Sequence, residues 1–283
     1  MQTVARVDAL RQQIKQWRED KLSIAFVPTM GNLHQGHLSL VNKARQLADK
    51  VVVSVFVNPL QFDDKNDLSA YPRTLAADVE KLESVACDLL FTPTADIIYP
   101  NGMEGQTIIT VPGMDDKLCG QARPGHFDGV ATVVAKLFNL VQADIAVFGE
   151  KDYQQLLLIK KMVTDLNIPV QILGADTHRE QNGLAMSSRN QYLTAPQRQQ
   201  AALLYQTLLA VKKKIEQGEH DFVTLEQAAF DDLKQSGFSP DYVDIRRADD
   251  LDRAKPDDRA FRILVAARLG NARLIDNIAC NLA

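Results

Sequence analysis

The segment VPTMGNLHQGH, residues 27–37, combines glycines and histidines in a spacing suited to binding phosphate. Gly31 and Gly36 have the spacing of the glycines of a Walker A loop, but a histidine and a leucine replace the lysine and hydroxyl residue of that motif, so this is not a P-loop. A glycine beside a helix N-terminus lets phosphate approach backbone N–H groups and the positive end of the helix dipole. His34 and His37, three residues apart, project from one face and can donate hydrogen bonds to phosphate oxygens. The segment therefore predicts a phosphate site.

The same residues are compatible with two alternatives. The segment can be an ordinary helix start with two surface histidines, or His34 and His37 can be two ligands of a zinc ion. A zinc site needs further ligands, and neither a third ligand at suitable spacing nor an HExxH motif is evident. We therefore favour phosphate binding.

A second candidate is FGEKD, residues 148–152, at another predicted strand-to-helix junction. Glu150 and Asp152 are acids that a helix N-terminus favours, whereas Lys151 opposes the helix dipole there. A cation at this position makes sense if an anion binds nearby. Gly149 would let a ribose or a phosphate approach the backbone.

A third candidate is MSSRN, residues 186–190, in a polar loop before a predicted helix. Its two hydroxyls, Ser187 and Ser188, and the Arg189 guanidinium can clamp a triphosphate without acting as a base or a nucleophile. A helix-capping loop accounts for the same residues, and taken alone the segment favours capping.

Two further segments offer polar groups for a small substrate. In FVNPLQF, Asn58 and Gln61 provide neutral hydrogen bonds and Phe62 an apolar wall, a combination that suits a small hydroxylated acid. In RPGHF, Arg123 and His126 flank a Pro-Gly turn, and they can either face an anionic substrate or simply lie on the turn. The sequence favours neither arrangement.

These segments need a scaffold that brings them together, and the apolar pattern predicts one. Short apolar runs alternate with helical periodicity through the first 175 residues, which indicates right-handed βαβ units and a parallel sheet. Ligands of such sheets bind at the carboxyl ends of the strands. Periodicity alone places Asp78 and Glu80 on a solvated helix face. The predicted strands are residues 22–27, 51–57, 88–91, 145–148 and 170–173, and the predicted helices are 38–48, 74–84, 129–141 and 152–166.

The pattern changes after about residue 174. A long helix over 196–218 and a second over 223–235 are followed by strands over 242–246, 261–266 and 273–277, the last two joined by a Gly270-Asn271 turn. This indicates a small α+β domain. We expect domain boundaries at 1–176 and 177–283.

Composition limits the classes of protein that remain. The 283 residues are 46% hydrophobic and 24% charged, which fits a globular protein. The net charge of −4 argues against a general nucleic-acid binder, and no segment approaches the ~20 apolar residues that span a bilayer. Three scattered cysteines in no CxxC pair, with no signal-like N-terminal run, favour a reducing compartment. We expect a soluble cytoplasmic protein with neither nucleic acid nor membrane as partner.

The motifs together resemble the pantothenate synthetase family. VPTMGNLHQGH, FVNPLQF, YPRT, RPGHF, FGEKDYQQ and MSSRNQYL occur in the order found there, whereas HxGH alone would indicate only the wider nucleotidylyltransferase superfamily. The resemblance implies an α/β fold, with a Rossmann-like parallel-sheet domain followed by a smaller α+β C-terminal lid domain. It also implies a homodimeric ligase that uses Mg²⁺ and ATP to join (R)-pantoate to β-alanine. The products would be pantothenate, AMP and pyrophosphate, formed through an enzyme-bound pantoyl adenylate.

The resemblance also implies roles for individual residues. His37, with His34, Lys151 and Arg189, would be catalytic at the phosphates, and Asp78 would help to position Mg²⁺. Family members usually have an aliphatic residue where this chain has His178, near the adenine. Substrate would be bound by Met30, Asn58, Gln61 and Gln155. ATP would be bound by Met30, Gly31, Asn32, Leu33, His34, Gln35, Gly36, His37, Gly149, Glu150, Lys151, Asp152, His178, Met186, Ser187, Ser188 and Arg189.

Two different functions are also compatible with HxGH. A nucleotidylyltransferase that makes a dinucleotide or an activated alcohol would share this motif but should lack the FVNPLQF and RPGHF loops. A nucleotide-sensing module would bind ATP without releasing pyrophosphate. The number of polar groups converging on strand ends favours an enzyme.

Overall fold

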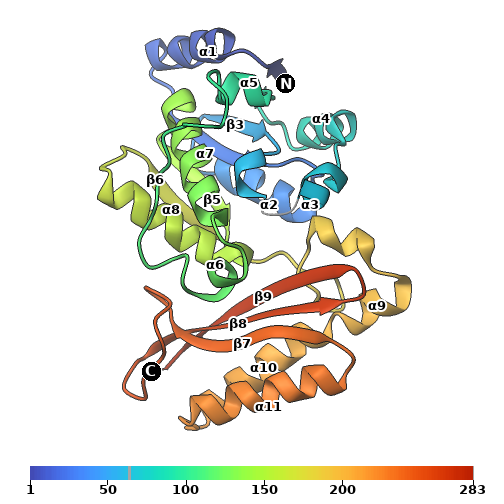
Figure 1. The fold of residues 1–283 in the computed structure, drawn as a ribbon. Helices are drawn as coiled ribbons and strands as arrows, with labels where there is room; N and C mark the ends of the chain where they lie inside the picture. Colours follow the sequence, from blue (N-terminus) through green and yellow to red (C-terminus); the bar gives the residue numbers. More distant parts are fainter. Residues whose placement is uncertain (63–64, 283) are drawn as a thin grey trace. The chain divides into compact units, whose positions relative to one another are not determined.

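Six short strands form one parallel sheet in the N-terminal part of the protein (Figure 1). The computed structural model describes residues 1–62 and 65–282. The strand order is β1-β4-β3-β2-β5-β6, and every neighbouring pair is parallel. The strands are β1 (Gln2–Val4), β2 (Ile24–Thr29), β3 (Lys50–Val55), β4 (Leu89–Phe91), β5 (Ile145–Gly149) and β6 (Gln171–Ala175).

Helices cover both faces of this sheet, which explains why its central strands are apolar throughout. Ala25 and Val27 of β2 belong to a buried cluster with residues of α2 and α4. Phe26, which points to the opposite face, meets Phe138 of α7 edge to face with ring centroids 6.4 Å apart. The helical elements are α1 (Val7–Glu19), α2 (Gln35–Arg45), η1 (Pro59–Gln61), α3 (Lys65–Ala70), α4 (Leu75–Ser84), α5 (Ala95–Ile98), α6 (Leu118–Ala122), α7 (His126–Val141), η2 (Glu150–Asp152) and α8 (Tyr153–Asp165).

Strand β2 lies between β3 and β5, so the direction of winding reverses around it. In an open parallel sheet this is where a ligand site forms, outside the carboxyl ends of the strands. The loop with the two histidines follows β2, and the loop with Asn58 and Gln61 follows β3. The sheet therefore brings these two loops to the same edge.

The C-terminal part contains a three-stranded antiparallel sheet in the order β7-β8-β9. Figure 1 shows α10 and α11 lying along one face of it, and their apolar residues share one buried cluster with the strands. The elements are η3 (Ser188–Tyr192), α9 (Ala195–Gln200), α10 (Leu203–Glu216), α11 (Phe222–Gln235), β7 (Ser239–Arg247), β8 (Ala260–Leu269) and β9 (Ala272–Asn281).

The chain divides into two compact units. The first contains Met1–Glu150 and Leu158–Asp176, and the second contains Lys151–Leu157 and the chain from Thr177 onward. The segment Lys151–Leu157 was expected in the first domain, but its contacts place it in the second unit. Among the helices of the described residues, none combines the length and the apolar character needed to cross a membrane.

The fold class expected from the sequence is confirmed: a parallel sheet with flanking helices precedes a small α+β part. The single helix expected over 196–218 is wrong, because the chain forms α9 and α10 instead. Ala201 and Ala202 between them have ψ of −22° and −21°, values typical of a 3₁₀ turn. The Ala202 N–H accordingly bonds the Gln199 carbonyl, and this turn tightens the chain between the two helices.

Candidate active site

The loop after β2 has a backbone that few residues can adopt. Gly31 has φ of +83° and Asn32 has φ of 50°, so two consecutive residues are left-handed. A Cβ on Gly31 would lie 3.0 Å from Val55 Cγ1 and 3.2 Å from an oxygen of Asp78. Both the conformation and the packing therefore require glycine at this position.

Asp78 on α4 holds this loop in place. Its Oδ2 accepts the Asn32 N–H at 2.9 Å and the Thr74 hydroxyl at 3.2 Å, and its Oδ1 accepts the Leu33 N–H at 2.8 Å. The Asp78 side chain is fully buried, so the solvated position expected from helical periodicity is wrong. The buried carboxylate is compensated by these three donors.

The role of Asp78 in helping to position Mg²⁺, which the resemblance implies, stays a prediction. Both oxygens of Asp78 accept hydrogen bonds from the protein, so a direct bond to Mg²⁺ would have to use a remaining lone pair of the carboxylate. Across residues 1–62 and 65–282, no group of three or more His, Cys, Asp or Glu residues is arranged to hold a metal.

The two histidines form the N-terminal cap of α2. His34 is the N-cap residue, and its Nδ1 accepts the Gly36 N–H at 3.2 Å. The Nδ1 of His37 accepts the His34 N–H at 3.3 Å, and the two ring centroids are 4.1 Å apart. Because a backbone N–H can only donate, each neutral ring must carry its hydrogen on Nε2. The capping box therefore turns both side chains into Nε2–H donors at the positive end of a helix.

Asn58 and Gln61 are connected through a chain of hydrogen bonds. The Tyr99 hydroxyl donates to Asn58 Oδ1 at 2.7 Å, and Asn58 Nδ2 donates to Gln61 Oε1 and to the Gly129 carbonyl, both at 3.1 Å. Gln61 Nε2 in turn donates to Met30 Sδ at 3.2 Å. Burial raises the pKa of Tyr99, so its hydroxyl stays protonated and fixes which way both amides face.

Arg123 and His126 contact the loop that contains Asn58 and Gln61. The Gln61 carbonyl accepts from His126 Nδ1 at 2.7 Å and from Arg123 Nη2 at 3.2 Å. His126 Nε2 lies 3.1 Å from Arg123 Nη1 and accepts from it, because arginine can only donate. On α7, Gly129 allows the close approach of this loop, since a Cβ there would lie 2.4 Å from the Leu60 carbonyl oxygen. Arg123 and His126 of RPGHF are thus both tied to the backbone of Gln61.

The end of β5 leaves room beside its backbone. A Cβ on Gly149 would meet only Leu40 Cδ2, at 4.0 Å, so neither packing nor backbone conformation demands a glycine. Glycine at this position is therefore free to serve the close approach of a ligand.

In the second unit, Lys151 and the 186–189 segment are both held by hydrogen bonds. The Lys151 side chain is largely buried, and its backbone carbonyl accepts from Asn277 at 2.8 Å. Ser187 caps η3, its hydroxyl accepting the Arg189 N–H at 3.2 Å. Capping therefore explains one of the two serines. The Met186 N–H bonds the carbonyl of His178, whose side chain is exposed, and Gln155 is half-buried in the first turn of α8.

A family model described as Pantoate-beta-alanine ligase matches residues 2–279. The chain belongs to this family. Pantoate-beta-alanine ligase relatives include the pantothenate synthetases of Shewanella baltica (strain OS223), 55% identical over 98% of this chain and 99% of the relative, and of Azotobacter vinelandii, 56% identical over the whole of both.

Solved structures of the pantoate-beta-alanine ligase family share the fold. The pantothenate synthetase of Thermus thermophilus has a TM-score of 0.91 and 44% identity, covering 98% of this chain and 99% of its own. The ligase of Francisella tularensis, solved with β-γ ATP and β-alanine, has a TM-score of 0.80 and 34% identity over 98% of this chain and 97% of its own.

Several residues that hold the motif segments within each unit were not found from the sequence. Tyr99 lies 41 residues from Asn58, and Asn277 lies 126 residues from Lys151. Neither belongs to a motif with a characteristic spacing. Asp78 and the two histidines of α2 were identified, but their hydrogen-bond partners were not.

Proposed function

We propose that this protein condenses (R)-pantoate with β-alanine at the expense of ATP, through an enzyme-bound pantoyl adenylate. The observation that carries the proposal is the paired capping of α2 by His34 and His37, which leaves both rings as Nε2–H donors. Donors that are already oriented stabilise charge that develops on phosphate oxygens. The solved relative from Francisella tularensis, with β-γ ATP and β-alanine bound, supports the same pair of ligands here.

In the first step, a carboxylate oxygen of pantoate attacks the α-phosphorus of ATP. A bond forms between that oxygen and phosphorus, the bond to the bridging oxygen of the β-phosphate breaks, and pyrophosphate leaves. His34, His37, Lys151 and Arg189 would donate to the phosphate oxygens, and residues 30–37, 149–152, His178 and 186–189 would surround the nucleotide. No protein nucleophile is needed, so the protein contributes positioning and charge stabilisation.

In the second step, the amine of β-alanine attacks the acyl carbon. The bond from that carbon to the bridging oxygen breaks, AMP leaves with this oxygen, and the amine loses a proton. Gln61 would bind both substrates, because its Nε2–H group is directed by the chain from Tyr99. Met30, Asn58 and Gln155 would complete the pantoate site. Mg²⁺ would arrive on the triphosphate, and Asp78 would help to position it by holding the backbone of Asn32 and Leu33.

The wider setting is also part of the proposal. A homodimer rests on the resemblance, and light scattering should give twice the mass of one chain. A cytoplasmic location agrees with the three scattered cysteines, Cys87, Cys119 and Cys280, which form no CxxC pair. The C-terminal part would act as a lid over the nucleotide.

An isotope experiment tests the reaction. Pantoate labelled with ¹⁸O in its carboxylate should give AMP carrying one labelled oxygen, and mass spectrometry of the products measures it. Label in inorganic phosphate, or ADP as a product, would refute the adenylate route. Retention of the adenylyl group in the product would indicate a nucleotidylyltransferase, and absence of pyrophosphate release would indicate a nucleotide sensor.

A histidine variant with a matched control tests whether the oriented histidines at the start of α2 stabilise charge on the phosphates. His37→Ala should lower kcat/KM by ~10²-fold or more, the usual effect of losing one oriented donor. His220 is an exposed histidine of the second unit, and His220→Ala should leave kcat/KM unchanged. Equal activity of the two variants would contradict the assigned role of His37.

A further inference from the structure

Two adjacent polar residues are buried in the middle of β9, an edge strand of the C-terminal sheet. Asp276 and Asn277 are each 3% exposed, and their partners on β8 are Val265 and Leu264. Burying a carboxylate and an amide among apolar residues is unfavourable unless each is hydrogen-bonded. The hydrogen-bond partners of Asp276 and Asn277 therefore indicate the role of these two residues.

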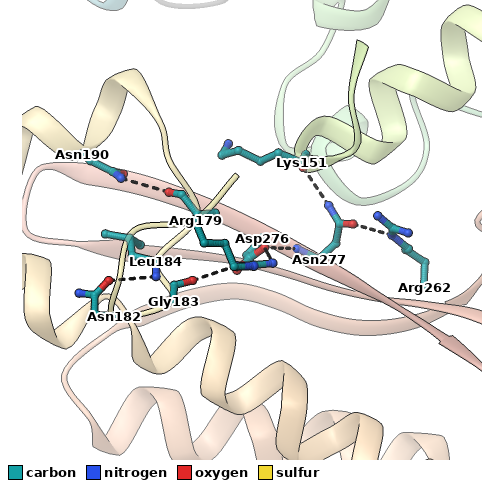
Figure 2. Close-up of polar contacts among 10 residues, drawn as sticks. Lys151, Arg179, Asn182, Gly183, Leu184, Asn190, Arg262, Asp276 and Asn277 are labelled. Atoms are coloured by element: carbon teal, nitrogen blue, oxygen red, sulfur yellow. Dashed lines mark hydrogen bonds and ion pairs between the residues drawn. The ribbon is translucent and has the colours of Figure 1, made fainter. Parts of the chain in front are cut away.

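Asp276 fixes the base of the segment that leads to residues 186–189. Arg179 donates to both oxygens of Asp276, at 2.6 and 2.9 Å (Figure 2). The guanidinium carbon of Arg179 lies 3.7 Å from the centre of the Tyr205 ring. Arg179 also forms a β-bridge with Ala185 and donates to the Gly183 carbonyl at 3.0 Å. The turn immediately before residues 186–189 is thus closed on an arginine that Asp276 holds in a bidentate pair.

Asn277 fixes the backbone of Lys151. Its Nδ2 donates to the Lys151 carbonyl at 2.8 Å, and its Oδ1 accepts from Arg262 Nε at 2.5 Å (Figure 2). A carbonyl can only accept and a guanidinium can only donate, so only this orientation of the amide satisfies both partners. Arg262 lies 3.9 Å from the centre of the Tyr153 ring, and the Tyr153 hydroxyl donates to the Ala248 carbonyl at 2.8 Å.

Asp276, which holds Arg179, and Asn277, which holds the Lys151 carbonyl, are coupled to one another. Successive side chains of a strand point to opposite faces, and adjacent residues are separated by about 3.3 Å along it. The Asn277 N–H also donates to Asp276 Oδ1 at 2.7 Å. One short stretch of strand therefore sets the spacing between the Lys151 backbone and the 186–189 segment within this unit.

We propose that Asp276 and Asn277 are positioning residues that hold the two nucleotide-binding segments of the second unit, Lys151 and residues 186–189, at a fixed spacing for adenylation. The inference rests on the proposed function, which places both segments at the phosphates of ATP. Neither residue is among those assigned to the nucleotide. Disturbing them should therefore raise the KM for ATP and leave the KM for β-alanine, which is assigned to Gln61 in the first unit, unchanged.

The test is Asn277→Asp, which has the same shape, keeps an acceptor for Arg262 and removes the donor to Lys151. We expect the KM for ATP to rise about tenfold, the effect of losing one buried hydrogen bond, with the KM for β-alanine within twofold. Asn271→Asp makes the same charge change at the exposed turn between β8 and β9, and should have no effect on either KM.

A double mutant separates positioning from general damage. If Asn277 acts through Lys151, then Asn277→Asp should change the KM for ATP less than twofold in a Lys151→Ala background. A full tenfold effect in that background, or equal rises in both KM values, would overturn the inference. If Lys151→Ala alone leaves ATP use unchanged, the assignment of Lys151 in the proposed function fails instead.

A second variant covers the case in which Asn277→Asp does not fold. Arg179→Lys keeps a positive charge opposite Asp276 but cannot form the bidentate pair. It should raise the KM for ATP several-fold, leave the KM for β-alanine unchanged, and keep a cooperative thermal transition. An unchanged KM for ATP in this variant would overturn the inference for Asp276.

Discussion

Replacing Asp78 by asparagine tests how the loop with the two histidines is held. The change keeps the shape of the side chain but removes its charge and one of its acceptor oxygens. In either orientation of the amide, an NH₂ group must face a backbone N–H, because Asn32 and Leu33 each donate to a different oxygen. One hydrogen bond becomes a contact between two donors, and the other loses its charge assistance.

The size of the effect follows from these contacts. A hydrogen bond to a charged group contributes roughly 1.5–3 kcal/mol, and a neutral one about 1 kcal/mol. Removing the buried charge recovers part of its desolvation penalty. We therefore expect a net loss of about 2 kcal/mol in the free energy of unfolding. For a unit of this size that loss corresponds to a decrease in Tm of roughly 4–8 °C.

The assay is thermal unfolding of the purified variant, combined with a titration of activity against Mg²⁺. Glu80→Gln is the matched control, since it removes one charge from the exposed side of the same helix and should change stability by less than ~0.5 kcal/mol. The reasoning would be refuted by an unchanged Tm together with a shifted Mg²⁺ requirement. That outcome would make Asp78 a metal ligand and not an anchor of the loop.

Four other experiments have defined outcomes. Tyr99→Phe removes the hydroxyl that orients the Gln61 amide through Asn58. Steady-state kinetics should show a KM for pantoate that rises about fivefold and a KM for ATP that changes less than twofold. Equal rises in both KM values would contradict this role. Gly129→Ala places a Cβ 2.4 Å from a carbonyl oxygen and should lower Tm measurably, whereas a Tm equal to that of the parent would show that the loop can shift. Burial raises the pKa of Cys87 from 9.0 to about 12, so iodoacetamide at pH 8 should spare it in the native protein and modify it after unfolding, as peptide mass spectrometry can show. The same shift should make stability fall between pH 9.0 and about 12, because the unfolded thiol loses its proton first; unchanged stability there would contradict the burial argument.

The scaffold could be predicted because its pattern is local. A run such as VVVSVFV, covered by helices on both faces, predicts a buried parallel strand without knowledge of its neighbours. Pro28 is a harder case, since proline is disfavoured in a central strand. The pairing of β2 with β5 ends at Phe26, so Pro28 lies beyond that ladder and its missing N–H breaks no bond to β5. The sequence does not show where the pairing of β2 with β5 ends, so this tolerance of Pro28 could not be predicted.

Most of the site chemistry depended on long-range contacts that the sequence does not encode locally. The motifs identified His34, His37 and Gln61, because glycines and strand ends mark such loops. The two backbone partners of Asp78 lie 45 and 46 residues away, so helical periodicity placed that residue in solvent. Arg123 and His126 were equally compatible with a substrate site and a plain turn, and a single carbonyl oxygen on a distant loop decides where they point.

His34 and His37 both cap α2 and are both proposed to act at the phosphates, and this double demand limits which residues can replace them. At position 34 a side chain needs an acceptor for the Gly36 N–H, which asparagine provides as one of the best N-cap residues. Asparagine has no imidazole Nε2–H, so it can meet the structural demand without the chemical one. A library of variants sorted for folding should therefore accept asparagine at position 34, and the same library sorted for turnover should reject it. Comparing the two sorted libraries at position 34 would then show separately how strongly folding and how strongly turnover require histidine there.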